Sequence, residues 1–227
     1  MMSISQIILA THITAGVISL VLFWAPLLTT KGRTLHIRFG RAYTYTMYIV
    51  VISALILSVV RFSIGGYQAG LALFFLGILT AIPLLSGIQV LKAKKSNTAF
   101  RKLQLALAIT LLITSLGMFA GWWYLNSGLL LGFGFLGLFA GGADVRQFLR
   151  STKTNWLREH YQGMLFSGAA AYTAFFAFGG NTLLSHVLTG WLAIIPWLLP
   201  TLLTMALMPL VHKRFKQVKR AEQPKAA

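Results

Sequence analysis

Seven long apolar runs constrain the fold of this chain more than any other feature of its sequence. They fall near residues 7–29, 42–64, 68–91, 103–125, 128–143, 161–179 and 183–211. A helix needs about 20 residues to cross a hydrocarbon core of about 30 Å, and six of the runs are long enough. Only helices and closed barrels satisfy every backbone hydrogen bond inside a bilayer. The runs therefore predict an all-α integral membrane protein, a seven-span helical bundle.

The composition supports a membrane environment. Hydrophobic residues make up 57% of the 227 residues, and charged residues make up only 10%. A soluble domain usually carries about a quarter charged residues. So few charges cannot cover the surface of a soluble domain of this size.

The run at 128–143 is the shortest and is rich in glycine (LLLGFGFLGLFAGG). Such a segment forms either a thin, tightly packed span or a re-entrant element. We count it as a span because the distribution of charge requires a crossing at this point.

Basic residues are concentrated in every second connection between the runs. All but one of the 20 Lys and Arg residues follow the first, third, fifth or seventh run, and Arg61 is the exception. Under the positive-inside rule these connections are cytoplasmic and the N-terminus is outside. The four clusters are Lys31, Arg33, Arg38 and Arg41; Lys92, Lys94, Lys95, Arg101 and Lys102; Arg146, Arg150, Lys153 and Arg158; and Lys213, Arg214, Lys216, Lys219, Arg220 and Lys225.

The domain organisation follows from the same pattern. Residues 1–212 are expected to form one seven-helix transmembrane domain, and residues 213–227 a basic cytoplasmic tail. The first run has no basic flank before it and no A-x-A cleavage site, which argues against a removed signal peptide. No connection is long enough to form a second domain. The expected location is the bacterial inner membrane, with several crossings.

Charge and residue types exclude several classes of function. The formal net charge is +17, but no soluble domain carries the cations, so we expect anionic lipid head groups rather than nucleic acid as the partner. The chain has no cysteine and therefore no disulfide, thiolate ligand or catalytic thiol. No acid lies within an apolar run, which argues against carboxylate-driven ion transport.

Four of the five histidines have a glycine three or four residues later. They are His12 with Gly16, His36 with Gly40, His160 with Gly163 and His186 with Gly190. That spacing places the histidine and the glycine on one helix face. In the seven-span topology His12 and His186 lie near the outer side, and His36 and His160 near the inner side.

The histidines therefore form an outer and an inner pair, provided that the first and seventh spans pack together, and likewise the second and sixth. All four lie near predicted helix N-termini, where the helix dipole favours the neutral ring. The glycine beside each ring leaves space either for a flat macrocycle or for a neighbouring helix. Two imidazoles from facing helices and flat apolar walls are the requirements for binding haem b.

Other uses of these histidines stay open. Histidines near the membrane interface often only hydrogen-bond head groups, water or a helix end. Binding of a metal or a quinone, or proton transfer, is a further use that stays open for these histidines. Glu159, next to His160, and Asp144 are interpreted as ion-pair partners of nearby arginines. The alternative is that these acids donate protons to a site near the inner face.

Two stretches of the sequence resemble a family of bacterial predicted membrane proteins classed as a domain of unknown function. The first is H-x3-G followed by KG-x3-H-x3-GR-x-Y, and the second is HYQGM-x4-AAAYTAF, from His160 to Phe175. The resemblance implies a multi-span helical protein without an established activity. The suspected kinship with b-type membrane cytochromes rests on an analogy of fold alone, and fold does not determine function. The residues that match the first motif are His12, Gly16, Lys31, Gly32, His36, Gly40, Arg41 and Tyr43.

The leading hypothesis is a redox role, with b-type cytochrome-like electron transfer across the membrane between a quinone or other redox partner and an acceptor. The haem iron would be held by His12 with His186 and by His36 with His160, and Arg38 and Arg41 would neutralise propionates at the inner site. The alternatives are a transporter or permease for a small solute, suggested by the glycine-rich run and by prolines in the last run, and a non-catalytic subunit of a membrane complex.

Overall fold

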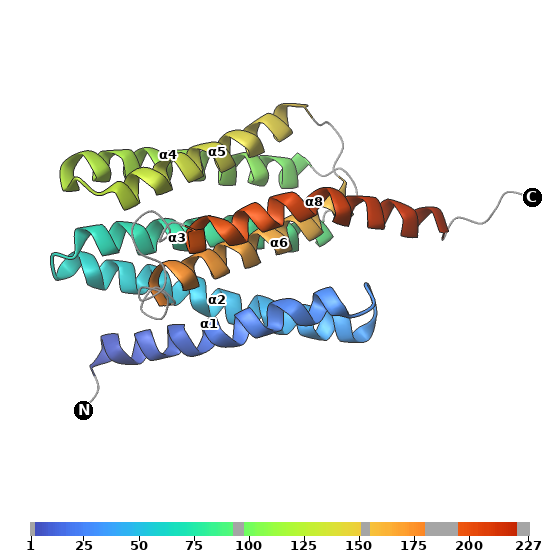
Figure 1. Cartoon of the computed structure of the whole chain (residues 1–227), viewed down its shortest axis with the longest axis horizontal. Coiled ribbons are helices and arrows are strands. Elements are labelled where there is room, and N and C mark those ends of the chain that lie inside the picture. Colours follow the sequence, from blue (N-terminus) through green and yellow to red (C-terminus); the bar gives the residue numbers. More distant parts are fainter. Residues whose placement is uncertain (1–2, 93–97, 151–154, 180–194, 222–227) are drawn as a thin grey trace, which may run out of the picture. The chain divides into compact units, whose positions relative to one another are not determined.

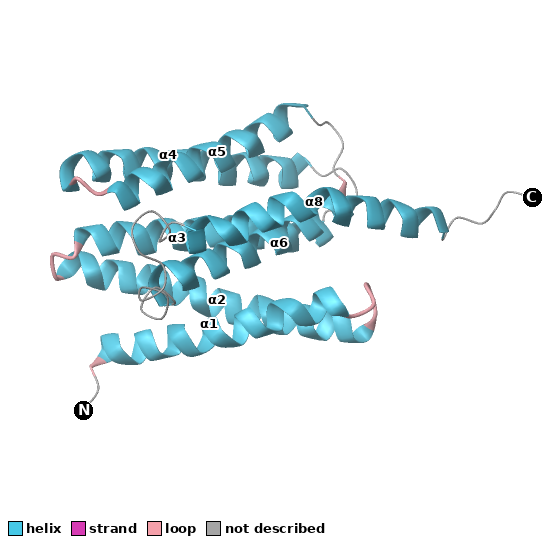
Figure 2. Cartoon of the chain, in the orientation of Figure 1, coloured by secondary structure: helices cyan, strands magenta, loops and turns pink. Residues whose placement is uncertain are grey.

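A computed structural model describes residues 3–92, 98–150, 155–179 and 195–221. Within these residues the chain is helical and contains no strand (Figure 2). The long helices are α1 (Ile4–Leu28), α2 (Thr34–Ser63), α3 (Tyr67–Lys92), α4 (Thr98–Leu125), α5 (Gly128–Arg150), α6 (Trp156–Ala174) and α8 (Ile195–Ala221), and a π-helical segment, η1 (Phe175–Gly179), follows α6.

Five helices, α1 to α5, have the length and apolarity needed to cross a membrane. The prediction of an all-helical fold is therefore confirmed for the described residues, and these five helices are suited to a membrane protein. Helix α5 is continuous over 23 residues, so the glycine-rich run forms a regular helix that is long enough to span a membrane. The last apolar run is described only from residue 195, where α8 begins and continues to Ala221, within the basic segment that the sequence predicts to be a tail.

The helix ends have recognisable local causes. Ser3 and Gln6 form a capping box at the start of α1, in which each side chain bonds the backbone N–H of the other residue. Gly32 and Gly65 have φ near 78° in the connections before α2 and α3, a left-handed conformation that glycine adopts without steric cost. Because these connections are short, α2 runs antiparallel to α1, and α3 runs antiparallel to α2.

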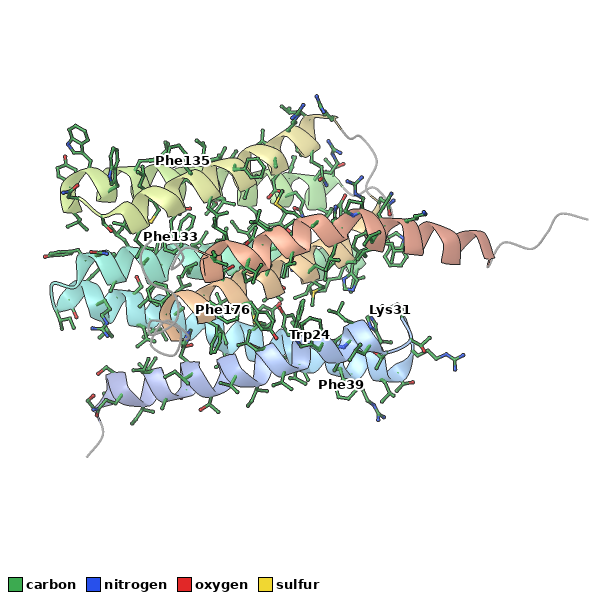
Figure 3. All side chains as sticks on the ribbon, in the orientation of Figure 1. Trp24, Lys31, Phe39, Phe133, Phe135 and Phe176 are labelled. Carbon is green, nitrogen blue, oxygen red and sulfur yellow. The ribbon has the colours of Figure 1, made fainter. Side chains whose placement is uncertain are left out.

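The chain divides into two compact units, Met1–Ala171 and Tyr172–Ala227. In the first unit α1 packs on α2, α2 on α3, α3 on both α4 and α5, and α4 on α5. Phe133 of α5 is buried and stacks on Phe75 of α3 with ring centroids 5.4 Å apart, whereas Phe135 is 59% exposed (Figure 3). In the second unit α8 contacts η1, and the hydroxyls of Thr173 and Thr201 lie 3.5 Å apart.

Helix α6 also packs within the first unit. Met164 and Ala171 of α6 lie against a buried cluster of Tyr43, Met47 and Leu84 from α2 and α3. A Cβ at Gly168 of α6 would meet the ring of Phe23 from α1. This part of the core is therefore built from α1, α2, α3 and the part of α6 that ends at Ala171.

Candidate functional site

The site centres on two histidines near one end of the first unit. Figure 1 shows that α2 and α6 both begin at this end, which is also where α1, α3 and α5 end. His36 lies in the first turn of α2, and His160 lies in the second turn of α6. Both imidazoles are half-buried.

His36 connects the first two helices. Its Nδ1 lies 3.1 Å from the carbonyl oxygen of Pro26, near the C-terminal end of α1. The Lys31 ammonium donates to the same oxygen and to the carbonyl of Leu27, each at 2.7 Å. The last four carbonyls of a helix have no helical N–H partner, so these two side chains satisfy groups that the helix leaves unpaired.

His160 connects α6 to α3. Its Nδ1 lies 2.7 Å from the carbonyl oxygen of Gly87. The two backbones come close here, since a Cβ at Gly163 would lie 2.7 Å from the Gly87 Cα and 2.5 Å from the Pro83 oxygen. Gly163 therefore makes room for α3. Of the two uses that the sequence leaves open for this glycine, the structure shows the neighbouring helix.

These contacts fix the tautomer of each ring. A carbonyl oxygen can only accept a hydrogen bond, so Nδ1 carries the proton in both His36 and His160. The Nε2 of the neutral ring then keeps its lone pair and can accept a hydrogen bond or bind a metal. A histidine that binds a metal through one nitrogen commonly donates from the other in this way.

His12 makes the same kind of contact in the body of α1. Its Nδ1 lies 2.8 Å from Ser53 Oγ and 3.1 Å from the carbonyl oxygen of Val50, both on α2. Ser53 donates its own proton to the carbonyl of Ile49 at 2.6 Å, so its oxygen accepts from His12. His186 and Gly190, the predicted partners in the outer pair, lie outside the described residues.

The register of α2 against α6 brings His36 toward His160. The hydroxyl of Tyr43 lies 2.9 Å from that of Ser167, and both side chains are almost fully buried. Tyr43 follows His36 by seven residues, and Ser167 follows His160 by seven. Because the two helices run in the same direction, the same step of two turns, about 10 Å, leads from the hydroxyl pair back to the histidine pair.

A second observation agrees with this register. His36 is near enough to His160 to interact with it electrostatically. The structure therefore brings together the inner pair that the sequence predicts, on α2 and α6.

An apolar core begins immediately inside the histidine pair. Tyr43, Met47 and Leu84 are buried, and partly buried apolar side chains pack around them. The ring of Phe23 lies 5.9 Å from that of Tyr43. The site is thus polar at the end of the unit and apolar toward its middle. The surrounding side chains are Leu22, Phe23, Tyr48, Ile88, Met164 and Ala171.

The remaining predicted residues are distributed unevenly. A Cβ at Gly16 or Gly40 would meet nothing within 4 Å, so the face beside each of these glycines is open. Arg38 and Arg41 are exposed on the first turns of α2. Glu159 is half-buried and interacts electrostatically with Arg101 and Arg158, as expected for an acid at this charged end.

Three contributors to the site were not predicted as site residues from the sequence. Gly87 supplies a carbonyl from α3, which carries no histidine, and no local pattern indicates that role. Tyr43 and Ser167 form the polar pair inside the site. Each follows a histidine of the site by seven residues, and this shared spacing is visible in the sequence. Among the described residues, no group of three or more His, Asp and Glu side chains could hold a metal ion.

Comparison with known proteins identifies no similar protein. No protein-family model, no curated protein and no solved structure matches the chain. Its function is therefore inferred from the histidine pair, from the helices that hold it and from the distribution of charge.

Proposed function

We propose that this chain is a multi-pass protein of the bacterial inner membrane that transfers electrons, in the manner of a b-type cytochrome, through a haem held by His36 and His160. One observation carries the proposal. Two half-buried imidazoles from different helices come together, and each donates from Nδ1 to a backbone carbonyl, which leaves Nε2 for an iron.

Several properties of the pair and its surroundings support this proposal. Neutral imidazoles are the ligating form, and the two carbonyl contacts hold them in the tautomer that ligation through Nε2 needs. The apolar side chains inside the pair would supply a wall, and the exposed Arg38 and Arg41 would neutralise propionates. A bound haem b would supply one-electron transfer. The open face beside Gly40 is the one available to it, since α3 occupies the face of Gly163.

The proposed topology has seven spans with the N-terminus outside. It is supported by the first unit, where Arg61 is the one described cation at the end opposite the histidine pair. A membrane protein carries its basic connections on the cytoplasmic side. The pair would then lie near the cytoplasmic face, and a quinone or another redox partner would meet the protein there or from the opposite side. The cations at the histidine end are Lys31, Arg33, Arg38, Arg41, Lys92, Arg101, Lys102, Arg146, Arg150 and Arg158.

The outer pair stays a prediction. Its member His12 has the same Nδ1 contacts as the inner histidines, and its member His186 is not described. The test of the inner pair is therefore designed so that its result does not depend on whether a second haem binds.

The test is the visible spectrum of the detergent-purified protein, expressed with ample haem, in its oxidised and dithionite-reduced forms. We expect the α and β bands of bis-imidazole haem b in the reduced protein. His36→Ala and His160→Ala should each lower the haem content by the same amount. The double variant should lose no more than either single variant, because both ligands hold one haem.

His212→Ala is the matched control. His212 lies on α8 in the second unit and is not one of the proposed ligands, so its replacement should leave the haem content unchanged. A colourless wild-type protein, or single variants that keep the full haem content, would overturn the proposal.

A further inference from the structure

We propose that Gly87 and Gly163 are positioning residues for His160: their close backbone contact brings the Gly87 carbonyl to Nδ1 of His160 and so decides which ring nitrogen is free to bind. Nothing in the sequence alone links Gly87 to His160, since the two residues are 73 positions apart. The consequence for a haem rests on the proposed function, but the effect on the tautomer does not.

The contact depends on the absence of two side chains. A Cβ on Gly163 would lie 2.7 Å from both the nitrogen and the Cα of Gly87. A Cβ on Gly87 would lie 3.1 Å from the Met164 nitrogen and 3.2 Å from the His160 oxygen. Real Cβ atoms essentially never come within 3.0 Å of backbone atoms, so an alanine at position 163 must push α6 away from α3. An alanine at position 87 requires a smaller displacement.

The displacement would act on His160 directly. Its Nδ1 lies 2.7 Å from the Gly87 oxygen, so moving the two backbones apart lengthens this hydrogen bond. Hydrogen bonds weaken beyond about 3.2 Å, and the preference for the Nδ1–H tautomer weakens with them. A metal-bound imidazole that loses its carbonyl acceptor becomes a less basic ligand.

The two other described His–Gly motifs provide a comparison. Beside Gly16 and Gly40 a Cβ would meet nothing within 4 Å, so these glycines do not bring another helix to their histidines. His12 and His36 reach their carbonyls on the neighbouring helix without such a contact. Among the three described histidines of these motifs, the dependence on paired glycines is therefore specific to His160.

The experiment measures the tautomer in the haem-free protein. The protein is labelled with ¹⁵N only at histidine, and long-range ¹H–¹⁵N NMR in detergent micelles reports which ring nitrogen carries the proton. The His160 signal is assigned by its loss in His160→Gln. We expect the Nδ1–H tautomer for His160 in the wild type, and a mixture of tautomers or the Nε2–H form in Gly163→Ala.

Gly87→Ala is the second variant, which keeps the test available if Gly163→Ala does not fold. It should shift the tautomer in the same direction by a smaller amount. Gly117→Ala in α4 is the matched control, since a Cβ there meets nothing within 4 Å, and it should leave the His160 signal unchanged. A wild-type tautomer in both the Gly87→Ala and Gly163→Ala proteins would overturn the inference.

The haem-loaded protein gives a separate result. If haem binds, the midpoint potential should rise in Gly163→Ala, because a less basic axial ligand stabilises the oxidised iron less. An unchanged potential together with a changed tautomer would count against His160 as the ligand and leave the positioning role intact. The two proposals therefore fail independently.

Discussion

At the scale of single residues, the same short motif serves different purposes in different surroundings. Histidine followed by glycine three or four residues later appears four times in the sequence. Beside Gly163 the missing side chain admits α3, whereas beside Gly16 and Gly40 it leaves open space. The three described histidines of these motifs share one feature, since each uses Nδ1 on a backbone carbonyl of another helix.

Tyr43 provides a test of the register between α2 and α6. Its hydroxyl donates to Ser167, which itself donates to the Met164 carbonyl at 2.9 Å. Tyr43→Phe removes one buried interhelical hydrogen bond, and such bonds contribute about 0.6 kcal/mol on average in a membrane protein. We expect a lower melting temperature of the detergent-purified protein, measured by thermal unfolding.

The control for this substitution is Tyr45→Phe. Tyr45 lies on the same helix two residues later and is 67% exposed, so its replacement should leave the melting temperature unchanged. Equal losses in the two variants would contradict the assigned contact, and so would no loss in Tyr43→Phe.

At the scale of helices, glycine determines how closely neighbours pack in this chain. The glycine-rich helix α5 packs against α3 and α4 because several of its glycines lie where a side chain would collide. A Cβ on Gly137 would meet Ser115 of α4, and it would lie 2.8 Å from the Phe75 ring of α3. Small residues at such crossings let helix backbones approach, which is how helices associate in lipid.

Gly137→Ala tests this packing. Overfilling a packed interior typically costs about 1–3 kcal/mol, so the substitution should lower the melting temperature of the purified protein. Gly132→Ala on the same helix is the matched control, because a Cβ there meets nothing within 4 Å. Alanine is also the better helix former, and the control should therefore be neutral or slightly stabilising. The opposite order of the two variants would exclude the packing described here.

At the scale of the whole molecule, the two ends of the first unit differ in their number of basic residues. Ten described cations lie at the end where α2, α4 and α6 begin, and Arg61 lies at the other. Among the described residues the acids Asp144 and Glu159 also belong to the basic end. In the proposed topology the positive-inside rule places the basic end on the cytoplasmic side, and the histidine pair would then lie close to that face.

Cysteine labelling tests this orientation, and the absence of native cysteine makes it direct. Thr34→Cys introduces a thiol at the start of α2 and Ser63→Cys one at its end, and both positions are exposed. In intact cells a membrane-impermeant maleimide should label residue 63. Residue 34 should react only after the membrane is permeabilised. The reverse pattern would invert the proposed topology.

The sequence by itself determined that the chain is helical, that it is suited to a membrane, and that its cations alternate between connections. These properties depend on local hydropathy and local charge, so they can be predicted without knowing how the helices pack. The positions of α1 to α6 follow the apolar runs closely for that reason. The short fifth run was predicted as a span from charge alone, and its continuous helix agrees with that prediction.

Only the tertiary structure decided what surrounds each histidine. The approach of His36 to His160 depends on the register of α2 against α6, and the Gly87 carbonyl comes from a third helix with no histidine of its own. The boundary between the compact units Met1–Ala171 and Tyr172–Ala227 likewise has no local signal in the sequence. Contacts between segments distant in sequence depend on how side chains fit together, and residue types and spacing along one helix do not specify that fit.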